Sequence, residues 1–256
     1  MAMHSLHMLG IKITPGTAEE FCEELSRLIT MERQALVFDI NVHGYNLAWQ
    51  LPWMAELYDR ADVNYVDGAG VVLGARLLGL KLPPRITMAD FGWVAAAHFA
   101  KRNHTLYLLG NPPGVADQAA EKLVAKAPGL RILGTQHGFF AKQGAENDAV
   151  IDAVNGCTPD VLMVGMGMPL EQRWVMDNHE RLQARVIWTV GAAFQYWAGI
   201  MRRCPQWMGD WGLEWLFRFL LEPRRMARRY VWGNAVFLMR VLQERHRLSR
   251  CGRQRP

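Results

Sequence analysis

Asp67 is the residue whose type and position most clearly suggest chemistry. It follows a short apolar run, Val63 to Val66, and precedes Gly68 and a small-residue stretch, Ala69 to Leu80, that is spaced as a helix. An acidic side chain at the carboxyl end of a strand lies at the edge of an α/β sheet where ligands bind. Asp is also a common helix N-cap, and Asp-Gly is a common turn. These residues alone favour a structural role, and a carboxylate at the mouth of a cleft is the alternative.

Glycine-containing loops follow three other predicted strands. They are Gly110 to Gly114, Gly165 to Pro169, and Gly191 to Ala193. Glycine lets backbone amides approach a ligand closely, and helix N-termini favour phosphate, so several such loops at one sheet edge suit a nucleotide diphosphate. Loops of α/β proteins also need glycine for structural reasons alone. None of the three matches the dinucleotide fingerprint or the Walker pattern, which argues against a nicotinamide oxidoreductase or a P-loop protein.

The residue pattern gives no reason to expect a metal or another cofactor. No D-x-D pair occurs, although many sugar-nucleotide transferases hold a divalent metal with one. The eight histidines and four cysteines are scattered without the spacing of metal ligands, and the absence of a cysteine framework fits a reducing compartment. In a transferase without a metal, cationic side chains or helix N-termini would have to neutralise the leaving group.

Charge is distributed unevenly along the 256 residues, half of which are hydrophobic. Residues 201–256 contain 13 arginines, no lysine and four acidic residues, a net charge of +9, whereas the rest of the chain has a net charge of −4. This asymmetry predicts a polyanionic partner, either a nucleic acid or an anionic membrane surface. The N-terminus lacks the features of a signal peptide, and no apolar run reaches the ~18 residues needed to span a bilayer. We therefore expect a cytoplasmic protein.

The basic C-terminal segment is also rich in tryptophan and leucine. Arg218, Arg225 and Arg228 are spaced at i, i+7 and i+10, so they would share one face of a continuous helix, although Pro223 permits a new helix start. Basic side chains mixed with tryptophan and apolar residues are typical of an interfacial helix. A solvated basic face and a nucleic-acid patch are the alternatives. We favour a membrane surface, because the apolar content is high for a nucleic-acid site. The apolar and tryptophan positions of this segment are Trp207, Trp211, Leu213, Trp215, Leu216, Phe217, Leu220, Leu221 and Trp232.

Elements that would position these residues follow from the hydrophobic pattern. Short apolar runs alternate with helical segments, which predicts an α/β fold with a Rossmann-like, mostly parallel sheet covered by helices on both faces. The one shift in composition falls near residue 200, so we expect an α/β domain over 1–200 and a helical appendage over 201–256. The predicted strands are 6–13, 35–40, 63–66, 105–109, 130–134, 161–164 and 186–190, and the predicted helices include 17–30, 47–60, 89–101, 115–127, 147–155 and 170–178.

With these motifs in view, the chain resembles the WecG/TagA/CpsF glycosyltransferases over about residues 35–235. The resemblance implies an inverting, metal-independent transfer of a sugar from a UDP-sugar to a polyprenyl-diphosphate-linked saccharide. It places the enzyme peripherally on the cytoplasmic face of the bacterial inner membrane, with no nucleic-acid partner, and a homo-oligomer is compatible with it. The motifs that carry it are Y-V-D-G-A-G-V at 65–71, P-R-I-T-M-A-D at 84–90, L-Y-L-L-G-N-P-P-G-V-A at 106–116, D-V-L-M-V-G-M-G-M-P at 160–169, A-G-I-M-R-R-C-P at 198–205 and G-L-E-W-L-F-R-F-L-L-E-P-R-R at 212–225.

The resemblance also implies roles for individual residues. Asp67 matches the general base, which takes the proton of the acceptor hydroxyl as its oxygen attacks the anomeric carbon. Asn41 matches a pocket residue, and Arg85 matches a cleft arginine that would hold a phosphate or a sugar carboxylate. Three appendage arginines match residues that engage diphosphate, a task suited to guanidinium geometry. Those arginines are Arg218, Arg225 and Arg228, and the other expected substrate-binding residues are Asp39, Gly110, Gly165, Gly167, Glu171, Gln172 and Gly191.

The chain departs from the family pattern at positions near this site. Asp39 stands where the family often has Thr, and Glu171-Gln172 reverses the usual Gln-Glu order. Two small-residue positions also differ: Ala192-Ala193 replaces Gly-Gly, and Cys204 replaces the alanine of R-A-P. These changes predict a different donor or acceptor, and we lean towards glucose transfer in exopolysaccharide synthesis. A non-catalytic scaffold of a polysaccharide assembly complex and an arginine-rich nucleic-acid-binding protein remain the alternatives.

Overall fold

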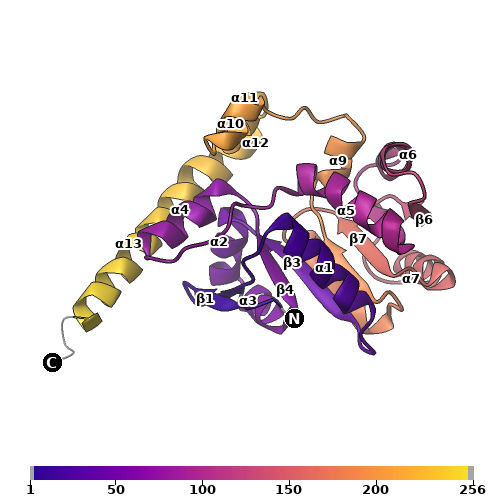
Figure 1. Cartoon of the computed structure of the whole chain (residues 1–256), viewed down its shortest axis with the longest axis horizontal. Coiled ribbons are helices and arrows are strands. Elements are labelled where there is room, and N and C mark those ends of the chain that lie inside the picture. Colours follow the sequence, from indigo (N-terminus) through magenta and orange to yellow (C-terminus); the bar gives the residue numbers. More distant parts are fainter. Residues whose placement is uncertain (1–2, 253–256) are drawn as a thin grey trace.

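The fold is built on one six-stranded sheet (Figure 1). The computed structural model describes residues 3–252, with the side chains of residues 225, 251 and 252 excepted. The strand order is β4-β3-β8-β7-β5-β6, and every neighbouring pair is parallel. The prediction of a largely parallel α/β fold is therefore confirmed. The strands are β3 (Ala35–Ile40), β4 (Val63–Val66), β5 (Thr105–Gly110), β6 (Arg131–Gln136), β7 (Val161–Gly165) and β8 (Val186–Thr189).

Helices cover both faces of the sheet. Successive strand residues point to opposite sides, so Leu106 and Leu108 pack in one apolar core while Tyr107 and Leu109 pack in the other. The strands β3, β5 and β7 are buried on both faces and are mostly apolar, whereas the edge strand β6 is only partly buried. One face is covered by α1 (Ala18–Ile29), α5 (Met88–Arg102), α6 (Val115–Lys126) and α9 (Ala193–Trp197), and the other by α2 (Val42–Gln50), α3 (Pro52–Arg60), α7 (Ala145–Cys157) and α8 (Leu170–Asn178), which η1 (His179–Arg181) follows.

Two expected elements are each divided in the structure. The single strand predicted over 6–13 is wrong: β1 (Leu6–Met8) and β2 (Ile11–Ile13) form an antiparallel hairpin, because Leu9 and Gly10 turn the chain at φ 52° and 78°. The single helix predicted over 47–60 is also wrong. It is the end of α2 followed by α3, since Leu51 before Pro52 is extended at φ −124° and ψ 92°.

Local capping at α1 agrees with the sequence. Thr17 has the residue type preferred at an N-cap, and its hydroxyl accepts a hydrogen bond from the backbone N–H of Glu20 at 3.3 Å. The Glu20 carboxylate in turn accepts one from the backbone N–H of Thr17 at 2.8 Å, which completes a capping box. This fixes the start of the helix that packs against α5.

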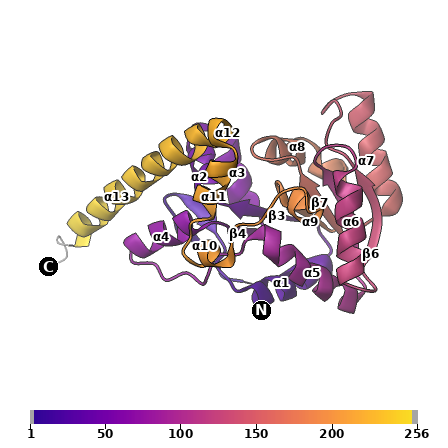
Figure 2. The same cartoon turned by 90° about the horizontal axis from the view of Figure 1, so that it is seen from above.

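The C-terminal helices gather over the β4 end of the sheet, far from β6 (Figures 1 and 2). They do not stand apart from the core. Phe237 and Val241 of the last helix are 4% and 0% exposed and pack in the same core as Tyr45, whose ring lies 5.4 Å from that of Phe237. A π-helical turn, Arg228–Trp232, precedes this helix. The elements here are α4 (Ala69–Leu77), α10 (Gln206–Asp210), α11 (Glu214–Leu221), α12 (Pro223–Ala227) and α13 (Gly233–Gly252).

None of the helices within residues 3–252 combines the length and the apolar character needed to cross a membrane.

Candidate active site

Asp67 opens into a cavity of about 520 Å³ between the carboxyl edge of the sheet and the C-terminal helices. Its backbone N–H donates to the carbonyl of Ile40 at 2.9 Å, which brings the ends of β4 and β3 together. Asp67 does not cap α4, whose N-cap is Gly68 at φ 94° without a side-chain hydrogen bond. The capping role considered for Asp67 is therefore not observed. This Asp67 cavity is lined by Asn41, Val42, His43, Asp67, Gly68, Ala69, Gly70, Leu73, Gly74, Trp211, Gly212, Leu213, Glu214, Trp215, Arg218, Arg229, Tyr230, Asn234, Phe237 and Leu238.

The Asp67 side chain is partly buried and accepts no hydrogen bond from any side chain that the structure describes. Burial, reinforced by Glu214, raises its pKa from the ordinary 3.8 to about 6, although Arg85, Arg218 and Arg229 act in the opposite direction. A carboxylate with this pKa is ionised at neutral pH and is more basic than an ordinary Asp. These are the properties required of a general base.

Asp39 and Asn41 form a linked pair beside this carboxyl. The Asn41 side chain caps α2, since its Oδ1 accepts from the backbone N–H of Gly44 at 3.0 Å, and its Nδ2 donates to Oδ2 of Asp39 at 2.9 Å. Asp39 is 7% exposed, and its Oδ1 has no partner among the described residues. Burial raises the pKa of Asp39 well above its ordinary value, and the charges of Glu171 and Asp67 add to this. Asn41 lines the cavity as expected, whereas Asp39 lies behind it.

His43 also lines the Asp67 cavity. Burial and the nearby Arg229 lower its pKa to about 4, so the imidazole is neutral at physiological pH. The carboxyl of Asp67 is therefore the stronger base of the two. Within residues 3–252 no group of three or more His, Cys, Asp or Glu side chains is arranged to hold a metal ion.

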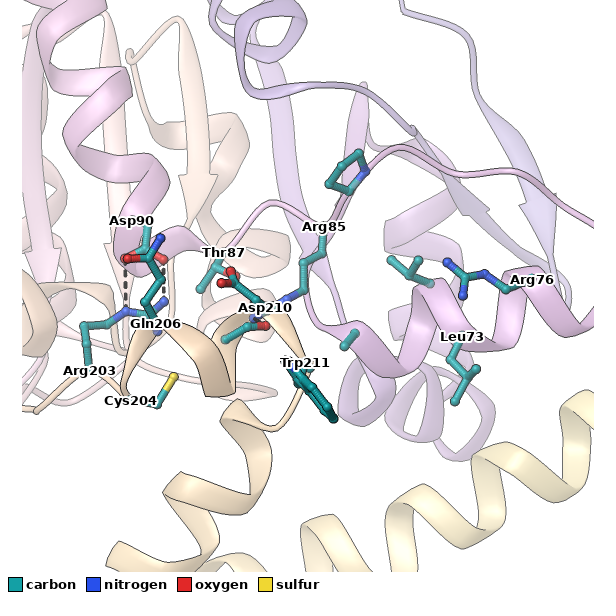
Figure 3. Close-up of a pocket in the computed structure, with 15 residues that line it drawn as sticks. Leu73, Arg76, Arg85, Thr87, Asp90, Arg203, Cys204, Gln206, Asp210 and Trp211 are labelled. Atoms are coloured by element: carbon teal, nitrogen blue, oxygen red, sulfur yellow. Dashed lines mark hydrogen bonds and ion pairs between the residues drawn. The ribbon is translucent and has the colours of Figure 1, made fainter.

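Arg85 takes part in an ion-pair network rather than pointing free into the Asp67 cavity. Its Nη1 lies 2.8 Å from Oε2 of Glu214 and donates to Oγ1 of Thr87 at 2.6 Å. Glu214 also pairs with Arg203, which reaches Asp90 at the start of α5 through its Nε at 3.0 Å (Figure 3). One carboxylate of α11 thus joins two arginines and connects the C-terminal helices to the sheet domain.

This network borders a second cavity of about 840 Å³, the Arg85 cavity, which contains more polar groups (Figure 3). The two cavities are adjacent, because Ala69, Leu73, Trp211 and Gly212 line both. The other residues of the Arg85 cavity are Val72, Arg76, Pro84, Arg85, Thr87, Asp90, Arg203, Cys204, Gln206, Gly209 and Asp210.

The appendage arginines do not lie as their spacing implied. Arg218 lines the Asp67 cavity, but Arg228 is exposed and lines neither cavity. Arg229, which the sequence analysis did not select, lines the Asp67 cavity instead. The side chain of Arg225 lies outside those described. The spacing argument assumed a continuous α-helix, but Glu222, at φ −133° and ψ 61°, separates α11 from α12, and a π-helical turn follows at Arg228–Trp232.

Glu171 holds two strand-end loops together. Its Oε2 accepts hydrogen bonds from the backbone N–H groups of Met166, Gly167 and Gly191 at 3.0, 2.8 and 3.1 Å. Burial raises the pKa of Glu171 to about 7, while these donors act to lower it. Gln172 donates to Oε1 of Glu171 at 3.2 Å. Glu171 and Gln172 are fully buried and line neither cavity, so direct contact with a substrate stays a prediction for both.

Gly110 and Gly165 are needed where β5 and β7 meet. A Cβ atom on Gly110, whose φ is 141°, would collide with the carbonyl of Gly165. A Cβ atom on Gly165 would lie 2.8 Å from Nδ2 of Asn111. That amide donates to the Gly165 carbonyl at 2.8 Å, so the close approach is part of the bonding at this edge. These two glycines have a packing role here, and their part in nucleotide binding stays a prediction.

Comparison with known proteins gives the same family as the motifs. The family model described as the glycosyl transferase WecG/TagA/CpsF family matches residues 6–251. Two proteins of Staphylococcus aureus, from strains MRSA252 and NCTC 8325 / PS 47, are named N-acetylglucosaminyldiphosphoundecaprenol N-acetyl-beta-D-mannosaminyltransferase. Each is 25% identical to this chain over 247 residues, which cover 95% of this chain and 94% of the relative. The resemblance is confirmed over almost the whole sequence. The chain is a glycosyltransferase and belongs to the WecG/TagA/CpsF family.

Proposed function

We propose that this glycosyltransferase moves a sugar from a UDP-sugar to a polyprenyl-diphosphate-linked saccharide with inversion at the anomeric carbon. The observation that carries the proposal is the Asp67 carboxyl, which has a raised pKa and no described hydrogen-bond partner and lies in a cavity beside Arg218 and Arg229. Such a transfer requires a base for the acceptor hydroxyl, and both of its substrates carry a diphosphate that cations would bind.

The reaction needs few protein groups. Asp67 would accept the proton of the acceptor hydroxyl while that oxygen forms a bond to the anomeric carbon of the donor sugar. The bond from the anomeric carbon to the diphosphate oxygen breaks, and UDP leaves with the electron pair. Cationic side chains or helix N-termini at the carboxyl edge of the sheet would stabilise the negative charge that develops on the departing diphosphate.

The identity of the two sugars is proposed from the relatives. Their names specify transfer of N-acetylmannosamine to N-acetylglucosaminyl-diphospho-undecaprenol, and we propose the same acceptor class for this chain. N-acetylmannosamine is the first candidate for the sugar transferred. Glucose is the second, because Asp39 and Glu171 depart from the usual residues close to Asp67. The product would contribute to an exopolysaccharide or another surface polymer.

Residues 201–256 are proposed as an appendage that binds the cytoplasmic face of the inner membrane. Its exposed side chains combine large apolar groups with arginines, the combination found in interfacial helices. Trp211 and Trp232 are 79% and 70% exposed, which is unusual for tryptophan. The other large apolar side chains exposed in this segment are Trp207, Trp215, Leu220, Leu221, Val231, Leu238, Met239, Leu242 and Leu248.

A donor screen tests the proposed function. Purified protein would be mixed with a short-chain prenyl-diphospho-N-acetylglucosamine and a panel of UDP-sugars in the presence of EDTA, and UDP release would be measured. We expect release with one sugar, and none from the Asp67→Asn variant. Release that depends on added divalent metal would contradict metal independence. If no UDP-sugar gives UDP release, even when vesicles and longer acceptors are supplied, the proposed function is contradicted.

A further inference from the structure

We infer that the Asp67 cavity is the site of the acceptor's prenyl diphosphate, with Arg218 and Arg229 binding the diphosphate and the apolar wall binding the first isoprene units. The inference rests on the proposed function, which names the acceptor class but not its place in the molecule. It differs from assigning these arginines to the donor's diphosphate, as the family resemblance implies.

The wall of the cavity favours a hydrocarbon over a nucleoside. Uracil and ribose carry several polar groups, and burying these without hydrogen bonds is costly. Leucine, phenylalanine and tryptophan side chains instead suit an isoprenoid, whose burial is driven by the removal of apolar surface from water. The large apolar residues of the wall are Leu73, Trp211, Leu213, Trp215, Phe237 and Leu238.

Arg218 and Arg229 are the cations in this cavity that remain available to a ligand. Neither forms an ion pair with a described carboxylate, and Nε of Arg229 is buried without a hydrogen-bond partner. Arg85, by contrast, is already paired with Glu214. Their guanidinium groups lie 5.9 and 5.7 Å from the rings of Tyr196 and Tyr230, which supply no formal counter-charge. A largely buried guanidinium without a counter-charge is costly unless a ligand supplies one, and a diphosphate matches its geometry.

Arg229 lies in the π-helical turn Arg228–Trp232, beyond the break between α11 and α12 at Glu222, whose φ is −133° and ψ 61°. Because of this break, Arg218 and Arg228 do not belong to one continuous helix. Arg228 is exposed, whereas Arg229 reaches the cavity. Such turns are often found at functional sites, because they redirect single side chains.

The apolar wall continues to the molecular surface, which a lipid-linked substrate requires. Leu73, Trp211 and Leu238 line the cavity and are still 54%, 79% and 43% exposed. Trp232 and Leu242 of the same C-terminal segment are exposed as well. A prenyl chain anchored in a bilayer could therefore reach the cavity along an apolar path, with its diphosphate at Arg218 and Arg229 and the attached saccharide extending towards Asp67.

Calorimetric titration with farnesyl diphosphate and with UDP tests the diphosphate part. The full-length wild type is compared with Arg229→Gln and with the matched control Arg228→Gln. We expect Arg229→Gln to weaken farnesyl diphosphate binding at least tenfold and UDP binding less than twofold, with Arg229→Lys restoring part of the loss. Arg228→Gln should change the affinity for neither ligand.

Three results would overturn the inference. The first is wild-type protein that does not bind farnesyl diphosphate. The second is an Arg229→Gln variant that binds farnesyl diphosphate as tightly as the wild type does. The third is an Arg229→Gln variant whose affinity for UDP falls as much as its affinity for farnesyl diphosphate, or more. The third result would indicate that Arg229 binds the diphosphate of the UDP-sugar donor. None of these results requires turnover, so they are distinct from silence in the donor screen, which bears on the proposed function itself.

The apolar part is tested with Leu238→Asn and the control Leu242→Asn, using pyrophosphate to represent the headgroup alone. Both leucines are on α13 and are similarly exposed, at 43% and 49%, but only Leu238 lines the cavity. We expect Leu238→Asn to weaken the binding of farnesyl diphosphate about tenfold, while pyrophosphate binds as tightly as it does to the wild type. Unchanged farnesyl diphosphate binding, or equal loss from the control, would overturn the assignment of the wall.

Discussion

Oε2 of Glu214 lies 2.8 Å from Nη1 of Arg85, so the C-terminal helices neutralise the arginine that the family motif places in the cleft. Both side chains are less than one-fifth exposed. Glu214 also pairs with Arg203, which comes from the segment leading into those helices. The contact therefore does two things: it attaches α11 to the sheet domain, and it places a negative charge close enough to Asp67 to raise the pKa of that carboxyl.

Replacing Glu214 by Gln should destabilise the fold by about 3 kcal/mol at pH 7, because it leaves two largely buried guanidinium groups without this partner. Burial raises the pKa of Glu214, but Arg203 and Arg85 outweigh that effect and the net pKa is lowered. The stabilisation is therefore present above the ordinary 4.5 and is lost as pH falls through the lowered folded-state pKa. Urea unfolding of the wild type and of Glu214→Gln at pH 7 measures the loss of stability, and the same comparison at pH 3 shows whether the difference disappears.

The matched control is Asp148→Asn, which breaks the exposed pair between Asp148 and Arg181 at 2.7 Å. Exposed pairs contribute roughly 0–1 kcal/mol, so this variant should resemble the wild type. Equal losses from the two variants would show that the Glu214 pair is an ordinary surface contact.

Asp67→Asn should remove turnover and at the same time stabilise the protein. The folded state raises the pKa of Asp67 from 3.8 to about 6, so it binds the proton more tightly than the unfolded chain. Stability therefore falls as pH rises from about 4 to about 6, by up to about 3 kcal/mol at 1.36 kcal/mol per pKa unit. Asparagine avoids this cost. We expect thermal unfolding of the variant at pH 8 to occur at a higher temperature, and an inactive variant that is also less stable would contradict the role of a base.

The pH dependence of kcat/KM should report the ionisation of Asp67. Activity should fall about tenfold per pH unit below about 6, as the base becomes protonated. Since Glu214 raises the pKa of Asp67, Glu214→Gln should move the midpoint to lower pH. His43 has a pKa of about 4, so His43→Gln should leave the midpoint in place. A midpoint that follows His43 rather than Glu214 would assign the base to the imidazole.

Much of the sheet could be predicted from the sequence, because its strands are short, mostly apolar and bounded by glycine or polar residues. The run Ala35 to Ile40 and the run Val63 to Val66 are strands with the expected limits. The errors fell where one residue changes the backbone. Leu9 adopts a positive φ and turns what reads as one strand into a hairpin, and Pro52 ends one helix and begins the next.

The candidate site was predictable only in part, for a related reason. Asp67 and Asn41 end adjacent parallel strands, so sequence position alone brings them together. Arg229 could not be selected in this way, because it lies in a π-helical turn beyond the break at Glu222, where spacing counted from Arg218 no longer gives a direction. The pairing of Glu214 with Arg85 joins residues 129 positions apart and depends on how the C-terminal helices dock. Spacing within one element carries no information about such contacts.

Glu171→Gln should be tolerated, whereas Glu171→Ala should cost about 3 kcal/mol or more, since it leaves three buried backbone N–H groups without an acceptor. A glutamine oxygen can keep those bonds. In the wild type, Oε1 of Gln172 has no partner among the described residues. If the amide of Gln172 flips, this oxygen can accept a hydrogen bond from the new amide at position 171. Because burial raises the pKa of Glu171 to about 7, its ionisation lowers stability as pH rises from about 4.5 to about 7. Urea unfolding at pH 8 should therefore rank Glu171→Gln at or above the wild type. A large loss from Glu171→Gln would mean that the negative charge itself is required.

Vesicle binding should depend on the exposed tryptophans of the C-terminal helices. Trp211 and Trp232 are largely exposed and neighbour arginine-rich segments, so replacing both by serine removes apolar area that would otherwise enter the interface. We expect at least a tenfold loss of binding to vesicles containing anionic lipid, measured by co-sedimentation, while the fold is retained. The control is Phe139→Ser, because Phe139 is 68% exposed but follows β6, at the opposite end of the sheet (Figures 1 and 2). If the control loses as much binding as the double variant, the membrane surface does not lie on the C-terminal helices.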